Sequence, residues 1–579
     1  MKQRSLLILS LAVLLFVSCK NKGGKSGLMV PKDAAVVVHI NSASLSSKLS
    51  WNEIKQTNWF KEMRSHTEST DSLAQKLWDD PSNSGIDTKE DFVMFIRKHG
   101  KGSYMVVEGS LTSQASYELI LAEMTKKEPK EIKKAGEFSY MVPHEKTVIL
   151  WNKSKFAMIT NANMPGNSIP GMPGGLMKNN RSSEDFAFDV DSLRIFGQQA
   201  LTLEGGDNLD ADSRFADLVK NGSDVHVWFN TGQYYSGMGF LKTMLPTVRT
   251  DALFKDNITA ASLNFDNGKI IAKTKHYYGD EMSKLLANNR PTSITADVIN
   301  RIPSSDVVAV MAFNYSPTGL KEMLRILGVD VMADAYLARL NYSIDEFVKA
   351  NKGEVVVAVT DPKVKMDSMQ MGGKMQVRPS RPDVNILFAT SVKDKASFEK
   401  MVTLLWDVSK QITGRGGAGD DKPGIPGINY KLENNWFAVS NSPDYADKFL
   451  AGGNSNLPFV SKITGHPMGI YVDLQRIIKF AGSMVKDSSS NKLLYEASLN
   501  MWQDVTATGG DFKNKSSEGQ FEINLVDKNT NSLKQLNQYI DKISTFMGTM
   551  KKERAEKWKN AMMENMRDSS ALMPPNSGN

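Results

Sequence analysis

The sequence predicts an α+β fold of two tandem, internally duplicated lobes with mainly antiparallel sheets and packed helices. Three observations support this prediction: the chain repeats itself once, tight turns link many of its strands, and helical segments interrupt the strands irregularly. With 579 residues and 41% hydrophobic content, the chain can fill more than one core. A doubly wound parallel sheet is not expected, because the strands follow one another too closely.

The duplication appears as segments that match in the same order along both halves. The apolar strand at residues 36–40 follows a proline-led turn and matches residues 308–312 at a separation of 272 (308 minus 36). Residues 115–118 match residues 396–399 at a separation of 281 (396 minus 115). The other matches are Phe156-Ala157 with Phe437-Ala438, Phe215 and residues 225–229 with Phe459 and residues 470–473, and Thr259-Ala260 with Thr506-Ala507. Chance matches would not usually keep this order, so we expect two homologous lobes.

Each element of the first lobe is predicted from its local pattern. Continuous apolar runs predict strands, apolar residues at helical spacing predict helices, and the Asn267-Gly268 step is typical of a hairpin turn. The expected strands are residues 36–40, 92–96, 104–107, 138–142, 147–151, 156–160, 225–229, 262–265 and 270–275. The expected helices are residues 51–63, 73–78, 116–126 and 215–220.

The first nineteen residues have the pattern of an export signal. Lys2 and Arg4 precede an apolar run at residues 6–17, and about 12 residues suit a signal peptide but are too few to span a bilayer. Cys19 is the only cysteine in the chain, which excludes an internal disulfide and Cys-based metal sites. Its position resembles the lipobox of bacterial lipoproteins, and the resemblance implies cleavage before Cys19 and acylation of that residue. The lipid bilayer, reached through acylated Cys19, is therefore the first expected partner.

These patterns divide the chain into five expected parts. Apolar residues at helical spacing from Leu533 to Met550 predict a docking helix, which Lys551 and the basic residues after it continue. The parts are residues 1–18 (lipoprotein signal peptide), 19–29 (flexible tether), 30–290 (first α+β lobe), 295–548 (second α+β lobe) and 549–579 (basic helix end and disordered tail).

The N-terminal part of the mature chain also carries a family resemblance. After the lipobox come Val-Pro-Lys-Asp-Ala at residues 30–34, a valine-rich strand, and Ser-Lys-Leu-Ser-Trp at residues 47–51. These features resemble the Bacteroidota lipoproteins grouped as domain of unknown function 4836. The resemblance implies a lineage and a place in the cell envelope, but it supplies no catalytic or binding residue.

Three glycine-, proline- or methionine-rich segments are expected to form neither strand nor helix: residues 161–183, 363–382 and 413–427. The second contains Met366, Met369, Met371 and Met375, soft ligands that suit Cu(I), although a polar loop explains them equally simply. In the third, residues 414–419 are glycine-rich, but Asp420 and Asp421 after them would repel a phosphate.

A separate acidic cluster, Asp207, Asp210 and Asp212, lacks the glycine and glutamate of a calcium loop, so a helix N-cap at Asp212 or Ser213 is favoured. No catalytic, cofactor or metal residue is therefore assigned. Cys19, as the lipidation site, is the one site residue.

The charge pattern and the missing motifs restrict the function. With 71 basic and 64 acidic residues, the net charge of +7 is small for this length, so nucleic acid is not an expected partner. No cofactor is expected, and we expect a non-enzymatic binding or scaffold component whose partner is an envelope protein or glycan. The alternatives are a hydrolase with carboxylates in the inter-lobe cleft, which have no spacing signature, and a metal-handling protein using the Met-rich loops.

The residues after Cys19 indicate a location. Residues 20–22, Lys-Asn-Lys, resemble neither an aspartate retention signal nor an acidic surface-export signal. We therefore expect a lipid-anchored protein of the outer membrane that faces the periplasm, with the cell surface as the alternative.

Overall fold

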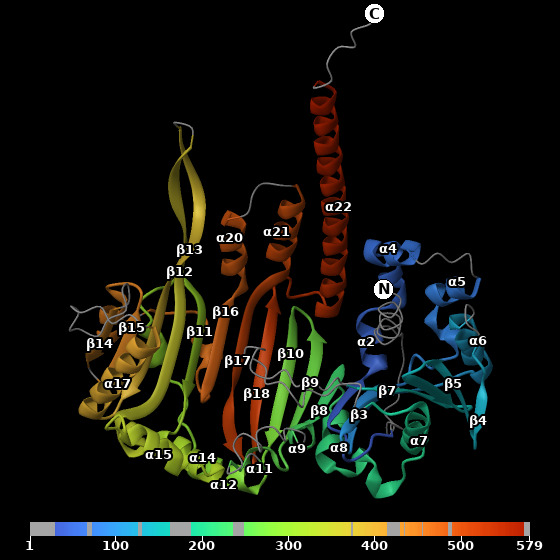
Figure 1. Ribbon diagram of the computed structural model, residues 1–579, viewed down its shortest axis with the longest axis horizontal. Coiled ribbons are helices and arrows are strands. Elements are labelled where there is room, and N and C mark those ends of the chain that lie inside the picture. Colours follow the sequence, from blue (N-terminus) through green and yellow to red (C-terminus); the bar gives the residue numbers. More distant parts are fainter. Residues whose placement is uncertain are drawn as a thin grey trace, which may run out of the picture.

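All the strands of the described chain belong to one antiparallel sheet. The computed structural model describes residues 29–66, 72–125, 130–162, 187–235, 248–249, 251–371, 374–413, 429–433, 435–453, 455–484 and 489–571. Within these residues, eighteen strands form one sheet and helices pack around it (Figure 1). The predicted α+β class with mainly antiparallel pairing is confirmed. No helix in this part of the chain is long and apolar enough to cross a bilayer.

The strands lie in an order that differs from their order in the sequence. Across the sheet the order is β4-β5-β6-β7-β3-β2-β1-β8-β9-β10, continued by β18-β17-β16-β11-β12-β13-β15-β14. The strands of the first half are β1 (Val36–Ile40), β2 (Phe92–His99), β3 (Gly102–Ser110), β4 (Lys133–Ala135), β5 (Phe138–His144), β6 (Thr147–Trp151), β7 (Lys155–Asn161), β8 (Val225–Asn230), β9 (Ile258–Asp266) and β10 (Lys269–Tyr277). Those of the second half are β11 (Val307–Asn314), β12 (Asn351–Met371), β13 (Lys374–Val392), β14 (Asn429–Glu433), β15 (Trp436–Ser440), β16 (Met468–Asp473), β17 (Trp502–Lys513) and β18 (Ser516–Leu525).

The two halves of this order mirror one another. Reading inward from β7 and from β15, β7-β3-β2-β1-β8-β9-β10 corresponds to β15-β13-β12-β11-β16-β17-β18, and β10 pairs with β18 at the centre. Two copies of one unit produce this arrangement when a pseudo-two-fold axis normal to the sheet relates them. The strand order therefore agrees with the duplication inferred from the sequence.

Aromatic contacts repeat at the predicted separations. Tyr117 on α6 (Gln114–Met124) lies 5.3 Å from Phe156, and Phe398 on α17 (Lys395–Thr413) lies 5.2 Å from Phe437, measured between ring centroids. Both members of the second contact lie 281 residues after those of the first (398 minus 117; 437 minus 156). The two helices are thus anchored to counterpart strands by counterpart side chains.

The separation of 272 residues between corresponding positions of β1 and β11 holds only at the start of β11. A β-bulge between Val307 and Ala309 inserts one residue, and beyond it the separation is 273. Val37 then corresponds to Val310: Val37 pairs with Trp228, and Val310 pairs with Tyr471. The bulge keeps the buried face of β11 in phase with that of β1.

The expectation that residues 363–382 form neither strand nor helix is wrong. They form the outer part of the β12–β13 hairpin, which projects beyond the neighbouring strands (Figure 1). Pro379 and Pro382 fit because the pairing shifts register between Lys365 and Met366, and a bulge tolerates a residue that cannot donate a hydrogen bond. The other two segments fall almost entirely outside the described residues.

The last helix of each half packs against the first helices of the other half. α22 follows β18 and contacts α4, while α12 follows β10 and contacts α14. The bounds are α3 (Trp51–Lys55), α4 (Asn58–His66), α12 (Asp280–Asn288), α14 (Pro317–Leu327) and α22 (Ser532–Ala571). The Asp541 carboxylate accepts hydrogen bonds from the backbone N–H groups of Asn58 and Trp59, and Lys534 pairs with Glu53 at 2.6 Å. Residues separated by more than 450 positions are thereby joined.

The docking face of α22 differs from the apolar stripe that its spacing predicts. Ile540 and Met547 are 48% and 51% exposed, whereas Gln535 and Asn537 are buried. The Gln535 amide donates to two carbonyls of the preceding turn, and the Asn537 side chain accepts from the Trp59 indole. Hydrogen bonds to specific partners, together with the packing of Leu533 and the buried Phe546, orient this helix.

We expect Asp541→Ala to lower the free energy of unfolding by about 1–2 kcal/mol, because it leaves the two backbone donors of α4 without their acceptor. Urea denaturation of the chain and its variant measures this change. Glu496→Ala, which removes an exposed i,i+4 pair with Lys492, is the control and should cost less than about 0.5 kcal/mol. Equal losses of stability from the two substitutions would contradict the conclusion that Asp541 joins α22 to α4.

Candidate functional site

A hollow of about 890 Å³ lies where the two halves of the sheet meet. Side chains of β9, β10, β17 and β18 form its floor, and α8 (Ser213–Lys220) contributes a wall. Lys273 and Gln520, which are direct partners on β10 and β18, lie in this floor. The two residues are also counterparts in the duplication, so the hollow lies on the pseudo-two-fold axis. We call it the central cleft.

Ion pairs neutralise much of the charge in the central cleft. Lys275 Nζ lies 3.0 Å from the Glu518 carboxylate, and His466 contacts Asp511. Glu518 is thus held by a lysine and Asp511 by an imidazole, an arrangement that suits binding better than proton transfer. Hydroxyl and amide groups complete much of the lining: Asn221, Ser262, Thr274, Tyr277, Thr508, Asn514, Ser516 and Gln520.

Arg214 forms the rim of the central cleft at α8. Its guanidinium binds Asp212 through Nε at 3.0 Å and Nη2 at 2.6 Å, and it lies over the rings of Trp228 and Tyr277. Hydrogen bonding to Asp212 raises the pKa of Arg214, and the guanidinium lowers the pKa of Asp212 against the effect of burial. Asp212 is the N-cap of α8, as predicted, while Asp207 and Asp210 lie in the preceding short 3-10 turns.

A chain of four polar side chains runs from the cleft wall into the first half. His39 Nδ1 lies 2.9 Å from His226 Nδ1, and His226 Nε2 lies 2.8 Å from the Asn221 side-chain oxygen. That oxygen also accepts from the backbone N–H of Ser223, so His226 Nε2 must be a donor and His226 Nδ1 an acceptor. His39 Nδ1 therefore donates to His226. His39 Nε2 lies 2.9 Å from the Asp91 carboxylate, the acceptor that ends the chain of contacts.

Burial determines the protonation state of His226. His39 and His226 are each 1% exposed. Burial and the charge of His39 lower the pKa of His226 to about 4, so His226 is neutral near pH 7. The Asp91 side chain is 28% exposed and links this buried pair to solvent.

These histidines belong to a row of directly paired residues that crosses the sheet. From Glu108 the row passes through Val93, His39, His226 and Ser262 to Lys273 in the central cleft. The counterparts in the second half are Ala389, Val356, Ala312, Gly469, Thr508 and Gln520. Titratable side chains of this row are therefore confined to the first half.

Glu108 is the carboxyl of this row, and its pKa is strongly raised. It is 5% exposed, and its Oε1 atom has no hydrogen-bond partner among the described residues. Burial raises the pKa of Glu108 to about 8, even though Lys155 and the backbone of Met29 act in the opposite direction. The folded chain therefore holds a protonated carboxyl inside the first half at neutral pH.

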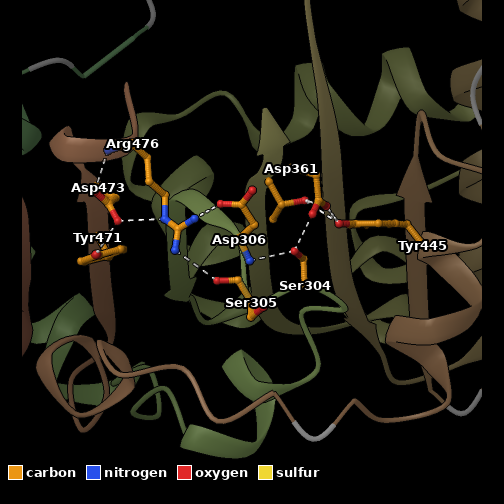
Figure 2. Close-up of polar contacts among 9 residues, drawn as sticks. Ser304, Ser305, Asp306, Asp361, Tyr445, Tyr471, Asp473 and Arg476 are labelled. Carbon is orange, nitrogen blue, oxygen red and sulfur yellow. Dashed lines mark hydrogen bonds and ion pairs between the residues drawn. The ribbon is translucent and has the colours of Figure 1, made fainter. Parts of the chain in front are cut away.

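A second polar network fastens the end of the sheet in the second half (Figure 2). The Asp361 carboxylate accepts from the hydroxyls of Ser304 and Thr360, each at 2.8 Å, from the Asn385 amide at 3.0 Å, and from the Tyr445 hydroxyl. Asp361 itself has a left-handed backbone with φ of 49°. A carboxylate with four donors is saturated, so this network is structural rather than a free base.

Beside this network, Arg476 joins two further carboxylates (Figure 2). Its Nε lies 2.9 Å from Asp473, and its guanidinium also contacts Asp306. Asp473 accepts from the backbone N–H of Arg476 at 2.9 Å, as Asn230 does from Gln233 at 3.1 Å in the first half. The same strand-end cap thus occurs twice, and it carries charged side chains only in the second copy.

Among known protein families, one family model matches the N-terminal part of the chain. Residues 28–185 match the family model described as domain of unknown function (DUF4836). The match covers 158 of 579 residues (185 minus 28 plus 1) and supports the resemblance inferred from that region. No curated protein matches the chain.

Solved structures give weaker similarity. Crystal forms III and I of TP0453 are each 10% identical to the chain with a TM-score of 0.24; they cover 48% of this chain, and the chain covers 91% and 90% of them. Crystal form IV of TP0453 is 9% identical, with a TM-score of 0.23. At these scores the alignments carry no argument about fold or function.

Several predicted sites fall outside the described residues. They include Cys19, residues 414–419, and the side chains of the methionines in the β12–β13 hairpin: Met366, Met369, Met371 and Met375. Among the residues that the structure describes, no group of three or more His, Cys, Asp or Glu side chains is placed to hold a metal ion. The copper and calcium alternatives gain no support from the described part.

Sequence reasoning missed the buried histidine pair and Glu108. The signal was present, because His39 and His226 each interrupt an otherwise apolar strand, and a polar residue on a buried face needs a partner. What the sequence does not show is that β1 and β8, nearly 190 residues apart, are neighbours.

We expect Glu108→Gln to change how stability depends on pH. Because the folded pKa lies near 8, the stabilisation from the protonated carboxyl is complete below about pH 4.5 and is lost as pH rises through 8. Glu108→Gln should match the parent chain at pH 4.5 and exceed its unfolding free energy by about 2–4 kcal/mol above pH 8. Denaturation across this pH range measures the difference, with exposed Glu137→Gln as control. Parallel pH profiles for parent and Glu108→Gln would contradict the assignment.

Proposed function

We propose that the chain is a non-enzymatic binding component of the cell envelope that holds a polar ligand in the central cleft. The observation that carries this proposal is the position of the cleft, on the pseudo-two-fold axis where both halves supply side chains. A volume of about 890 Å³ is within the range of ligand sites. The contacts of Glu518 with Lys275 and of Asp511 with His466 favour binding over hydrolysis.

A glycan segment is the ligand that this lining suits best. Hydroxyl and amide side chains such as Ser262, Thr508 and Gln520 both donate and accept hydrogen bonds, as sugar hydroxyls require. The lining carries both basic and acidic side chains, so it does not select a ligand of one strong charge.

We expect Lys273→Trp to weaken glycan binding at least about tenfold, because an indole in the floor occupies the cleft. The probe is a soluble oligosaccharide digest of envelope glycan, with affinity measured by titration calorimetry. Lys479→Trp, the same change at an exposed lysine of α20 (Leu474–Met484), is the control and should bind like the parent. Unchanged binding by Lys273→Trp, or binding only to a peptide digest, would refute the proposal.

For location, we propose an outer-membrane lipoprotein anchored through acylated Cys19 with its body in the periplasm. The lipobox-like segment that ends at Cys19 supports this proposal. The Bacteroidota lineage belongs to the same proposal.

Cells fed a fatty-acid analogue should incorporate it into the parent chain but not into Cys19→Ala, because this cysteine supplies the only thiol. The labelled chain should fractionate with the outer membrane and resist protease added to intact cells. Label retained by Cys19→Ala would exclude acylation at this residue, and cleavage in intact cells would instead place the body on the surface.

A further inference from the structure

α22 leaves the body of the protein after its docked segment. It projects away from the sheet (Figure 1). From residue 551 to residue 563, Glu553 alone is half-buried and the other side chains are exposed. The exposed residues include Trp558 at 67%, Met562 at 45% and Met563 at 47%. Large apolar side chains at such exposure on a projecting helix indicate a surface that has a partner.

Among the described residues, four of the five large exposed apolar residues of α22 lie along one face, and Met563 lies about 100° away from Met562. Ile540, Met547, Trp558 and Met562 are separated by 7, 11 and 4 positions, which at about 100° per residue places all four within roughly 60° of one another. Ile540 and Met547 are about half exposed, so the face is open even beside the docked segment. This face, which we call the α22 stripe, extends over about 33 Å at 1.5 Å per residue.

Basic side chains lie on and beside the α22 stripe, and acidic side chains lie on the opposite side of the helix. At the same 100° per residue, Lys551 lies within the stripe and Arg554 about 20° outside its edge, while Glu553 and Glu556 fall on the opposite side of the helix. The remaining basic residues, Lys552, Lys557 and Lys559, flank the stripe. The open face is therefore both apolar and cationic.

We propose that the α22 stripe lies against an anionic lipid surface. An indole and thioether side chains enter the boundary between headgroups and acyl chains, while lysine and arginine extend to the phosphates. A second copy of the chain fits less well, because stripe-to-stripe contact would bring Lys551 and Arg554 of both copies together. The contact requires neither the lipid on Cys19 nor a ligand in the central cleft.

The test uses residues 20–579, purified without a lipid anchor, and sedimentation with vesicles. Vesicles of phosphatidylglycerol and phosphatidylethanolamine should carry the chain down, and vesicles of phosphatidylcholine alone should not. Trp558→Ala and Lys551→Glu should each reduce the bound fraction at least about fivefold. Binding should also fall at about 0.5 M salt, because exposed charges are then screened.

Two matched control variants distinguish binding through the α22 stripe from nonspecific adsorption of the protein to vesicles. Tyr336→Ala removes an aromatic residue that is 60% exposed on α15 (Asp330–Ala338), at the other end of the sheet (Figure 1). Lys542→Glu reverses an exposed charge on α22 away from the stripe. Both should bind like the parent. Equal losses in controls and stripe variants, no binding to anionic vesicles, or a dimer that Trp558→Ala dissociates would each overturn the proposal. None of these outcomes bears on glycan binding.

Discussion

The pairing of β10 with β18 is the contact on which the rest of the structure depends. Nine consecutive residue pairs join the last strand of one half to the last strand of the other. A strand edge left open in either half would expose backbone donors and acceptors, and the pairing satisfies both edges at once. It also fixes the two-fold relation, which places the central cleft on the axis and brings each terminal helix within reach of the opposite half.

The duplicated halves have specialised in different ways while keeping their backbone contacts. The first half buries Glu108, His39 and His226 in one row, where the second half has alanine and glycine. Position 469 in the second half has no room for a side chain, since a Cβ added to Gly469 would lie 2.1 Å from the Ile463 carbonyl oxygen. The second half instead concentrates its charged and polar groups around Asp361 and Arg476 at the strand ends. Packing is thus shared by the halves, and polar chemistry is not.

The sequence predicts the parts of this fold that depend on local pattern. Most strands and the counterpart helices at Tyr117 and Phe398 could be placed because apolar periodicity and short matched segments are local signals. The bulge at Val307 was not predictable from matching alone, because one inserted residue leaves the surrounding residues recognisable. The β12–β13 hairpin was missed because its prolines and methionines resemble a loop until the partner strand is known. For the same reason, the histidine pair required knowledge of a long-range strand neighbour.

The terminal helices show how a symmetric duplication can acquire an asymmetric function. α12 and α22 occupy counterpart positions, and each crosses to the first helices of the other half. α12 spans nine residues and ends at its docking contact, whereas α22 spans forty and continues well beyond Asp541. The docked segment of α22 needs specific hydrogen bonds to hold its orientation, and that fixed orientation determines which face of the projecting part stays open. An extension added to an anchored helix therefore presents a defined surface, which an extension from a loosely held terminus could not do.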